Sequence, residues 1–218
     1  MDLADRLHLD CPVGQAGMGG GLAGAELAAA VAAAGGLGTL GLATPKQLRA
    51  SVDRVRERAP DRAVAVNLLL PFVHRAHVAV CVDAGVDCVV LAFGEKRGLV
   101  QHLREAGIFV FVMVGTAAQA SAAIRWGADG LIAQGREAGG HLVGTMPALQ
   151  FLPRALAAAG GQAVLLAGGI ADSADTRAAL AAGATGVVAG TRFLMTHEAN
   201  ANREYQRRVA KADKTIET

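Results

Sequence analysis

The sequence predicts a single-domain α/β protein, a (β/α)8 TIM barrel that occupies residues 1–218. Eight short apolar runs alternate with segments long enough to form helices. The runs are almost continuously apolar, as expected for parallel strands that are buried on both faces. An open, doubly wound sheet is the alternative, but eight repeating units favour a closed barrel.

The expected strands share a Val-, Leu- and Ala-rich composition and end in glycine or a polar residue. They are Pro12–Ala16, Leu37–Leu42, Ala63–Leu70, Cys88–Gly94, Ile108–Gly115, Gly130–Gln134, Ala163–Gly168 and Gly186–Gly190.

Helices are expected between the strands because the intervening segments carry helix start signals. The segment Pro45–Ala59 places Leu48, Val52 and Val55 on one face, with charged residues largely elsewhere. The segment Ala25–Ala34 is mostly alanine, so helix propensity supports it more than pattern. The expected N-terminal caps are Thr44, Thr116, Thr145 and Asp172.

A small residue followed by glycine recurs where helices should end, as in Ala84-Gly85, Ala106-Gly107, Trp126-Gly127 and Ala182-Gly183. Glycine is favoured at this position because the chain adopts a left-handed conformation before it enters the next strand. We therefore expect each of these glycines to terminate a helix.

Composition excludes several classes of protein. Hydrophobic residues make up 52% of the chain and charged residues only 18%, which argues against disorder. The formal net charge is +2 and the arginines are scattered, so no nucleic-acid partner is expected. No apolar stretch is typical of a membrane helix, and none is typical of a signal peptide at the N-terminus.

Three cysteines without metal-ligand spacing fit a reduced compartment, so a cytoplasmic location is expected. The final segment, 200–218, is polar and includes a candidate outer helix around Tyr205 to Lys211. The sequence stops at Thr218 without a clear cap. We therefore expect further sequence to follow this residue.

In a barrel of this kind the active site lies at the carboxyl ends of the strands. Gly168-Gly169 follows the seventh expected strand and Gly190-Thr191 follows the eighth. Exposed backbone amides on these neighbouring loops are typical of a phosphate site. The alternative is that the glycines only permit tight turns. Asp172 is interpreted as a helix cap, because a carboxylate would repel phosphate.

Three other strand ends carry candidate contacts for a planar ring. The loop Ala16-Gly17-Met18 follows the first strand and offers backbone approach with a soft apolar side chain. Asn67 lies inside an apolar strand and Gln134 ends another. A buried carboxamide needs hydrogen-bond partners, which a cofactor ring or a purely structural contact could equally supply.

The glycine-rich loop 135–141 follows the sixth strand and carries one titratable imidazole, His141. Its glycines, Gly139 among them, allow backbone to approach a ligand closely. We interpret His141 as a base or an anion contact. Glu137 of the same loop is expected to be solvated.

Together these features indicate flavin mononucleotide (FMN) across the barrel mouth, with its phosphate on the last two loops. No Gly-x-Gly-x-x-Gly motif opens a βαβ unit, so a dinucleotide fold is poorly supported. No metal-ligand cluster is evident. Two alternatives belong to other classes. One is a non-redox barrel enzyme, such as an isomerase or lyase, that binds a phosphorylated substrate, and the other is a barrel without activity.

The sequence resembles the nitronate monooxygenases, formerly called 2-nitropropane dioxygenases, over nearly its whole length. The resemblance rests on several motifs in order. They are Gln15-Ala16-Gly17-Met18, the segment 34–38, Val66-Asn67, Ala133-Gln134-Gly135, Glu137-Ala138-Gly139-Gly140-His141, the segment 167–172 and the segment 190–194.

The resemblance implies an FMN-dependent oxidoreductase that oxidises alkyl nitronates with molecular oxygen. It implies that His141 is the catalytic base toward a nitroalkane or a contact to the nitronate anion. The residues it implies as FMN contacts are Ala16, Gly17, Met18, Asn67, Gln134, Gly139, Gly168, Gly169, Gly190 and Thr191. The expected partners are this small substrate and O2; a homo-oligomer remains open. The family resemblance also implies that the sequence expected beyond Thr218 is a C-terminal helical extension.

The sequence departs from the family pattern in two places. Proline often stands where this chain has Gly17, and often soon after the Phe93-Gly94 pair, where this chain has Glu95-Lys96. The related flavin-dependent enoyl-ACP reductases, which use NAD(P)H, share the Gly-Gly-His loop. They typically have serine before it, so Ala138 favours the nitronate enzymes.

Overall fold

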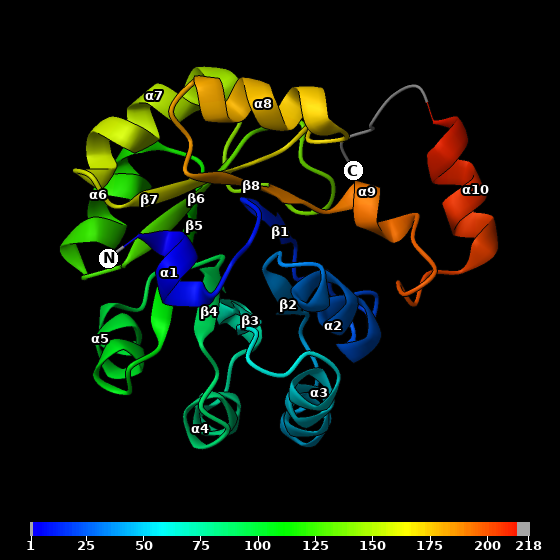
Figure 1. The fold of residues 1–218 in the computed structure, drawn as a ribbon. Coiled ribbons are helices and arrows are strands. Elements are labelled where there is room, and N and C mark those ends of the chain that lie inside the picture. Colours follow the sequence, from blue (N-terminus) through cyan, green and yellow to red (C-terminus); the bar gives the residue numbers. More distant parts are fainter. Residues whose placement is uncertain (1, 213–218) are drawn as a thin grey trace.

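The computed structural model describes residues 2–212. Eight parallel strands follow the order β1-β8-β7-β6-β5-β4-β3-β2. A parallel bridge between Gly14 and Leu37 joins the first strand to the second and closes the sheet. The predicted (β/α)8 barrel is therefore confirmed over the open alternative (Figure 1).

Each predicted strand is present, and most are shorter by one or two residues at their ends. The strands are β1 (Val13–Gln15), β2 (Gly38–Leu40), β3 (Val64–Leu69), β4 (Cys88–Ala92), β5 (Phe109–Val114), β6 (Gly130–Gln134), β7 (Ala163–Ala167) and β8 (Gly186–Ala189). Within this register, Asn67 of β3 lies opposite Val90 of β4.

Helices cover the outside of the strands, as buried parallel sheets require. They are α1 (Leu3–Leu7), α2 (Ala25–Ala33), α3 (Pro45–Arg58), α4 (Arg75–Asp83), α5 (Arg97–Glu105), α6 (Ala117–Arg125), α7 (Ala148–Ala159), α8 (Ser173–Ala181), α9 (Thr191–Leu194) and α10 (Arg203–Lys211), with a 3-10 turn at Leu70–Phe72.

The capping predictions hold for three of the four helix starts. Thr44 accepts a hydrogen bond from Gln47 N, and Thr116 accepts one from Gln119 N. Asp172 accepts from two backbone amides of α8. The prediction for Thr145 is wrong, because α7 begins after Pro147, whose side chain cannot accept a hydrogen bond.

The predicted helix-ending glycines adopt left-handed backbone conformations. Their φ angles are 57° at Gly85, 79° at Gly107, 95° at Gly127 and 100° at Gly183. Side chains with a Cβ rarely adopt these angles, so glycine at these positions is explained by the backbone itself.

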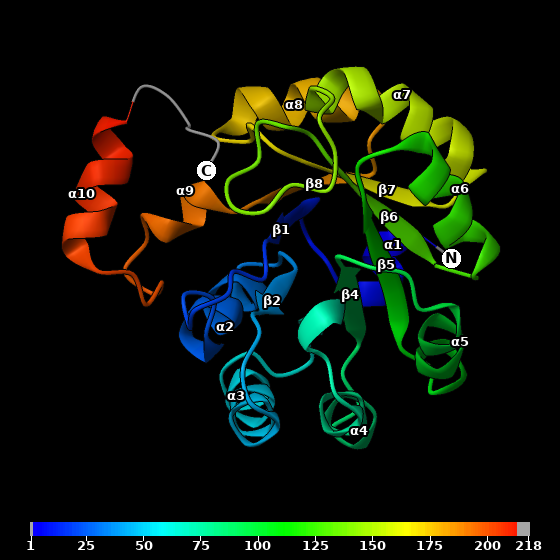
Figure 2. The same ribbon diagram turned by 180° about the vertical axis from the view of Figure 1, so that it is seen from behind.

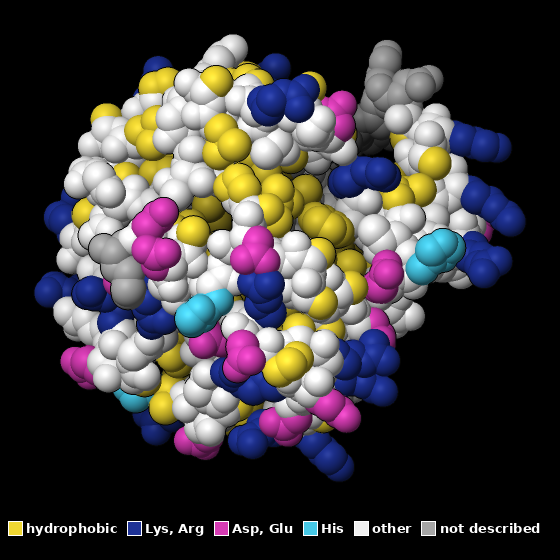
Figure 3. Space-filling model, viewed as in Figure 1, with side chains coloured by type: hydrophobic (Ala, Val, Ile, Leu, Met, Phe, Trp, Pro, Cys, Tyr) yellow, Lys and Arg dark blue, Asp and Glu magenta, His cyan; other side chains and the backbone are white. Residues whose placement is uncertain are grey.

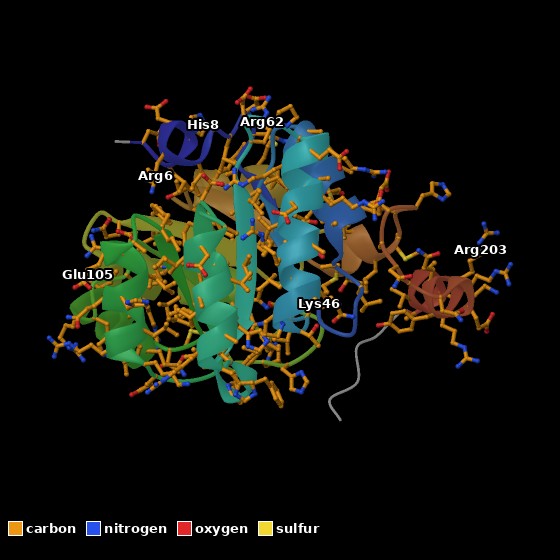
Figure 4. The ribbon with its side chains drawn as sticks, turned by 90° about the horizontal axis from the view of Figure 1, so that it is seen from below. Arg6, His8, Lys46, Arg62, Glu105 and Arg203 are labelled. Carbon is orange, nitrogen blue, oxygen red and sulfur yellow. The ribbon has the colours of Figure 1, made fainter. Side chains whose placement is uncertain are left out.

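A short helix that the sequence did not reveal closes the amino-terminal end of the barrel. Leu3 and Leu7 of α1 are buried in the same cluster as Phe111 and Ile132 of the barrel interior. Arg62 Nη1 donates to His8 O at 3.0 Å just after this helix, and Figure 4 shows these two side chains at the same end of the molecule. The barrel is therefore sealed at the end opposite the predicted active site.

Helix α10 lies apart from the barrel and has no buried residue (Figures 1 and 2). The predicted outer helix is thus present, but it contributes little to the core. The end of the predicted polar segment, 213–218, lies outside the described residues.

Surface charges are dispersed. On the face drawn in Figure 3, Lys and Arg side chains are spread over the surface rather than gathered in one patch. Within residues 2–212, no helix is long and apolar enough to cross a membrane.

Candidate active site

A cavity of about 460 Å³ opens at the carboxyl ends of the strands. All of the predicted site residues except Gly168 and Gly169 line it. These are Ala16, Gly17, Met18, Asn67, Gln134, Gly139, His141, Gly190 and Thr191. They come from the ends of β1, β3, β6 and β8, so the fold brings together residues that are far apart in the sequence.

The floor of the cavity is apolar and its walls carry little charge. Leu37, Val90, Ile132 and Val188 point into the barrel and form part of the lining. Among the described residues that line the cavity, only His141 and Tyr205 carry titratable side chains. A ligand's ring would therefore lie on aliphatic side chains, with one imidazole available for proton transfer.

Asn67 is the most informative polar group in the lining. Its side chain is 5% exposed, and its Nδ2 donates to Gly17 O at 2.9 Å. Its Oδ1 is buried and has no hydrogen-bond partner among the described residues. Because an orphaned buried acceptor is costly, this oxygen calls for a donor from a bound molecule.

The two glutamines of the cavity differ from Asn67 because their carboxamides are already used. Gln134 Oε1 accepts from Val143 N at 2.8 Å, and its Nε2 donates to His141 O at 3.2 Å. Gln15 bonds Thr39 N and Ala16 O in the same way. Gln134 was expected to contact the cofactor; in the structure its polar atoms position the loop that carries His141.

That loop is held by further backbone and side-chain bonds. Gly135 N donates to Ala167 O at 2.8 Å, and Arg136 N donates to Met146 O at 3.0 Å. Glu137 Oε2 accepts from Ala148 N at 2.9 Å. Glu137 is exposed to solvent, as expected, and its carboxylate also caps α7 in place of Thr145. Figure 2 shows the loop between β6 and α7.

His141 is exposed at the cavity wall, and its ring contacts Phe93. The two ring centroids lie 5.9 Å apart with an interplanar angle of 70°, an edge-to-face arrangement. None of the described residues forms a hydrogen bond with the imidazole nitrogens, so both remain available to a substrate.

The two predicted phosphate loops follow the neighbouring strands β7 and β8, and their glycines line two cavities. Gly190 and Thr191 line the large cavity, whereas Gly168 and Gly169 line an adjoining hollow of about 340 Å³ that also contains Asp175. The φ angles of Gly168 and Gly169 are 112° and 73°, which favours glycine irrespective of any ligand. These angles are compatible with the turn interpretation, and a phosphate site on both loops stays a prediction.

The structure adds lining residues that sequence reasoning missed. Thr39 lies in β2, Phe93 follows β4, and Tyr205 reaches the cavity from α10. Phe93 alone had a detectable signal, since an aromatic residue before glycine follows an apolar run. Its φ of 62° is unusual for a bulky side chain and is typical of functional sites.

These residues fit a planar, polar cofactor ring. Ideal geometry would place a Cβ on Gly17 inside contact distance of Asn67 Cβ, and one on Gly139 at 2.8 Å from Thr191 Oγ1. Both glycines therefore keep the walls close together without filling the space between them. The orphaned Asn67 Oδ1 offers an acceptor for a ring N–H.

The chain matches the family described as nitronate monooxygenase over residues 2–76 and 57–217. The chain belongs to the nitronate monooxygenase family, a family of oxidoreductases. The predicted resemblance is thereby confirmed.

One relative has a name that refers to a different substrate. It is the (3aS,4S,5R,7aS)-5-hydroxy-7a-methyl-1-oxo-octahydro-1H-indene-4-carboxyl-CoA dehydrogenase of Mycobacterium tuberculosis, 37% identical over 99% of this chain and 62% of its own length. The chain thus spans about three fifths of this relative.

Solved structures share the fold. FabK from Thermotoga maritima superposes with a TM-score of 0.89 at 32% identity, covering 96% of this chain and 67% of that one. The nitroalkane oxidase of Streptomyces ansochromogenes gives a TM-score of 0.86 at 31% identity, covering 94% and 71%. These proteins therefore share the architecture of this chain, although their names differ.

Proposed function

We propose that the protein binds FMN in the cavity at the barrel mouth and oxidises alkyl nitronates with molecular oxygen. The observation that carries the proposal is the buried, unpartnered Asn67 Oδ1 in a glycine-walled cavity whose other wall bears His141. Membership of the nitronate monooxygenase family supports the substrate class.

The residues that would hold the flavin come from four strands, β1, β3, β6 and β8. Ala16, Gly17 and Met18 supply backbone and a thioether beside the ring, and Asn67 supplies an acceptor. Gly139, Gly190 and Thr191 lie together on the other side, where backbone amides and a hydroxyl suit a phosphate. When bound, flavin supplies the acceptor for the substrate's electrons.

His141 has two roles in this proposal, according to the substrate. Toward a neutral nitroalkane, an imidazole nitrogen takes the proton from the carbon that carries the nitro group, leaving the nitronate anion. Toward a preformed nitronate, the protonated ring pairs with the anion. The aliphatic side chains of the floor offer an apolar surface to the carbon atoms of the substrate.

A second candidate is oxidation or reduction of an acyl thioester. The specific observation in its favour is the 37% identical relative named as a carboxyl-CoA dehydrogenase. An enoyl-thioester reductase of this barrel type would require NAD(P)H and a thioester, and neither is required for nitronate oxidation.

Two measurements test the proposal. The purified protein, reconstituted with FMN, should show the visible absorption of an oxidised flavin; a colourless protein that takes up no FMN overturns the cofactor assignment. Oxygen consumption with ethyl nitronate is then compared with NADPH consumption on a crotonyl thioester. Activity only in the second assay selects the thioester candidate.

A further inference from the structure

A second cavity of about 240 Å³ adjoins the candidate active site. Phe93 and Met113 line both cavities, and the chain passes from the large cavity at His141 to the second one at Leu142 and Val143. The two spaces therefore share two lining residues, Phe93 and Met113. We call the second space the side pocket; it lies between Phe93, Val112–Val114, Trp126 and Leu142–Val143.

The side pocket is lined mainly by apolar side chains. Its polar side chains are those of Glu95, which is exposed, and Gln119, whose Oε1 already accepts from Gly115 N at 2.8 Å. Among its described lining residues there is no Lys, Arg or His. An anionic group in this pocket would be repelled by the Glu95 carboxylate and would find no cation among the described lining residues. A neutral, apolar group is therefore the favoured occupant.

Phe93 controls the boundary between the two cavities. Its backbone has a φ of 62°, and the next residue, Gly94, has a φ of 149°. This unusual backbone directs the aromatic ring against His141 rather than into the barrel core. Phe93 therefore lines both the side pocket and the cavity that contains the imidazole.

We propose that the side pocket binds the alkyl chain of a substrate whose acidic carbon lies at His141. This proposal rests on the proposed function and extends it to the substrate's chain length. The nitro or nitronate group stays beside His141, because the side pocket has no cation for it. The hydrocarbon tail passes Phe93 and lies against Val143 and Trp126. The volume corresponds to about eight waters at ~30 Å³ each, which is sufficient for a short chain and not for a bulky polycyclic one.

Binding can be followed without turnover because Trp126 is the single tryptophan of the sequence. In the FMN-loaded protein, hexanoate, a planar anion with an alkyl tail, should change Trp126 fluorescence saturably, whereas acetate should not. Val143→Phe fills the pocket and should remove the hexanoate response. Leu149→Phe, at an exposed position outside the pocket, is the matched control and should retain it.

Turnover gives an independent measure. Val143→Phe should raise the ratio of KM for the nitronate of 1-nitrohexane to KM for ethyl nitronate at least ten-fold, whereas Val143→Ala should tolerate longer chains than the parent protein. If Val143→Phe fails to fold, the chain-length profile of Val143→Ala alone tests whether the side pocket binds the alkyl chain.

The outcomes separate the two proposals. Equal responses to acetate and hexanoate, or an unchanged chain-length profile in both variants, overturn the side-pocket assignment. A specific hexanoate response in a protein that oxidises no nitronate overturns the proposed function instead and supports the pocket.

Discussion

Asn67 donates from Nδ2 to the backbone oxygen of Gly17 at 2.9 Å, at a point where Gly17 has no space for a Cβ. We expect Gly17→Ala to displace the loop after β1 and weaken FMN binding. Gly19 of the same loop has open space around an added Cβ, so Gly19→Ala is the matched control. FMN dissociation constants from flavin fluorescence should rise for Gly17→Ala only.

Truncation of Asn67 should weaken FMN binding less than Gly17→Ala does. Asn67→Ala removes the unpartnered acceptor and the bond to Gly17, and a net hydrogen bond contributes about 0.5–1.5 kcal/mol. We expect FMN affinity to fall by up to roughly ten-fold per lost bond. Unchanged affinity in a folded variant would mean that the ring lies elsewhere.

Replacement of His141 should affect two substrates differently. His141→Ala should lower turnover of neutral nitroethane by about 10² or more, the usual contribution of a general base, and lower turnover of ethyl nitronate much less. His102→Ala, an exposed histidine on α5, is the control. Equal losses on both substrates would leave His141 with a binding role only.

Glu137 should matter for stability through its bond to Ala148 N at the start of α7. A helix cap contributes about 1 kcal/mol, which corresponds to a fall in Tm of about 2–4 °C for a chain of this size. Glu137→Ala should show this fall by circular dichroism, and Glu137→Gln, which keeps an acceptor oxygen, should show less. Identical Tm values for both variants would contradict the capping role.

Acid should weaken the start of α8. The backbone amides of Asp175 and Ala174 hold the pKa of the Asp172 carboxyl below its usual value. A depressed folded pKa means that this stabilisation is present above the unfolded pKa, near 4, and is lost as the pH falls below it. Asp172→Asn keeps a capping oxygen without a titrating group. Its loss of Tm between pH 6 and pH 3 should be smaller than that of the parent protein.

The three cysteines should differ in reactivity. Burial raises the pKa of the Cys81 thiol to about 12 and also raises the pKa of Cys88, whereas Cys11 is partly exposed. A thiol reagent at pH 8 should therefore label Cys11 rapidly and the other two only after unfolding. Rapid labelling of Cys11→Ser would show that the core opens under native conditions.

The barrel could be predicted because its strands carry a strong local signal. Runs such as Val64–Leu69 are apolar on both faces, and the helix-ending glycines take the left-handed angles expected of them. Helix α1 was missed because five residues are too few to show a periodic pattern, and its two leucines matter only once the barrel exists.

The site was predictable as a set of strand ends, but the partners of its side chains were not. Gln134 and Asn67 look alike in sequence, yet one carboxamide is satisfied by its own loop and the other is left with a free oxygen. The cap on α7 comes from Glu137, eleven residues before Ala148, rather than from the neighbouring Thr145. Such choices depend on loop geometry that no local pattern encodes.

Helix α1 closes the end of the barrel opposite the cavity, with Leu7 fully buried. Substrate, oxygen and product would then enter and leave through the same opening of the cavity. A second reactant could reach the ring only after the first product had left or moved aside. A shared access route favours ping-pong kinetics over simultaneous binding of both reactants. It also favours product release as the rate-limiting step of turnover.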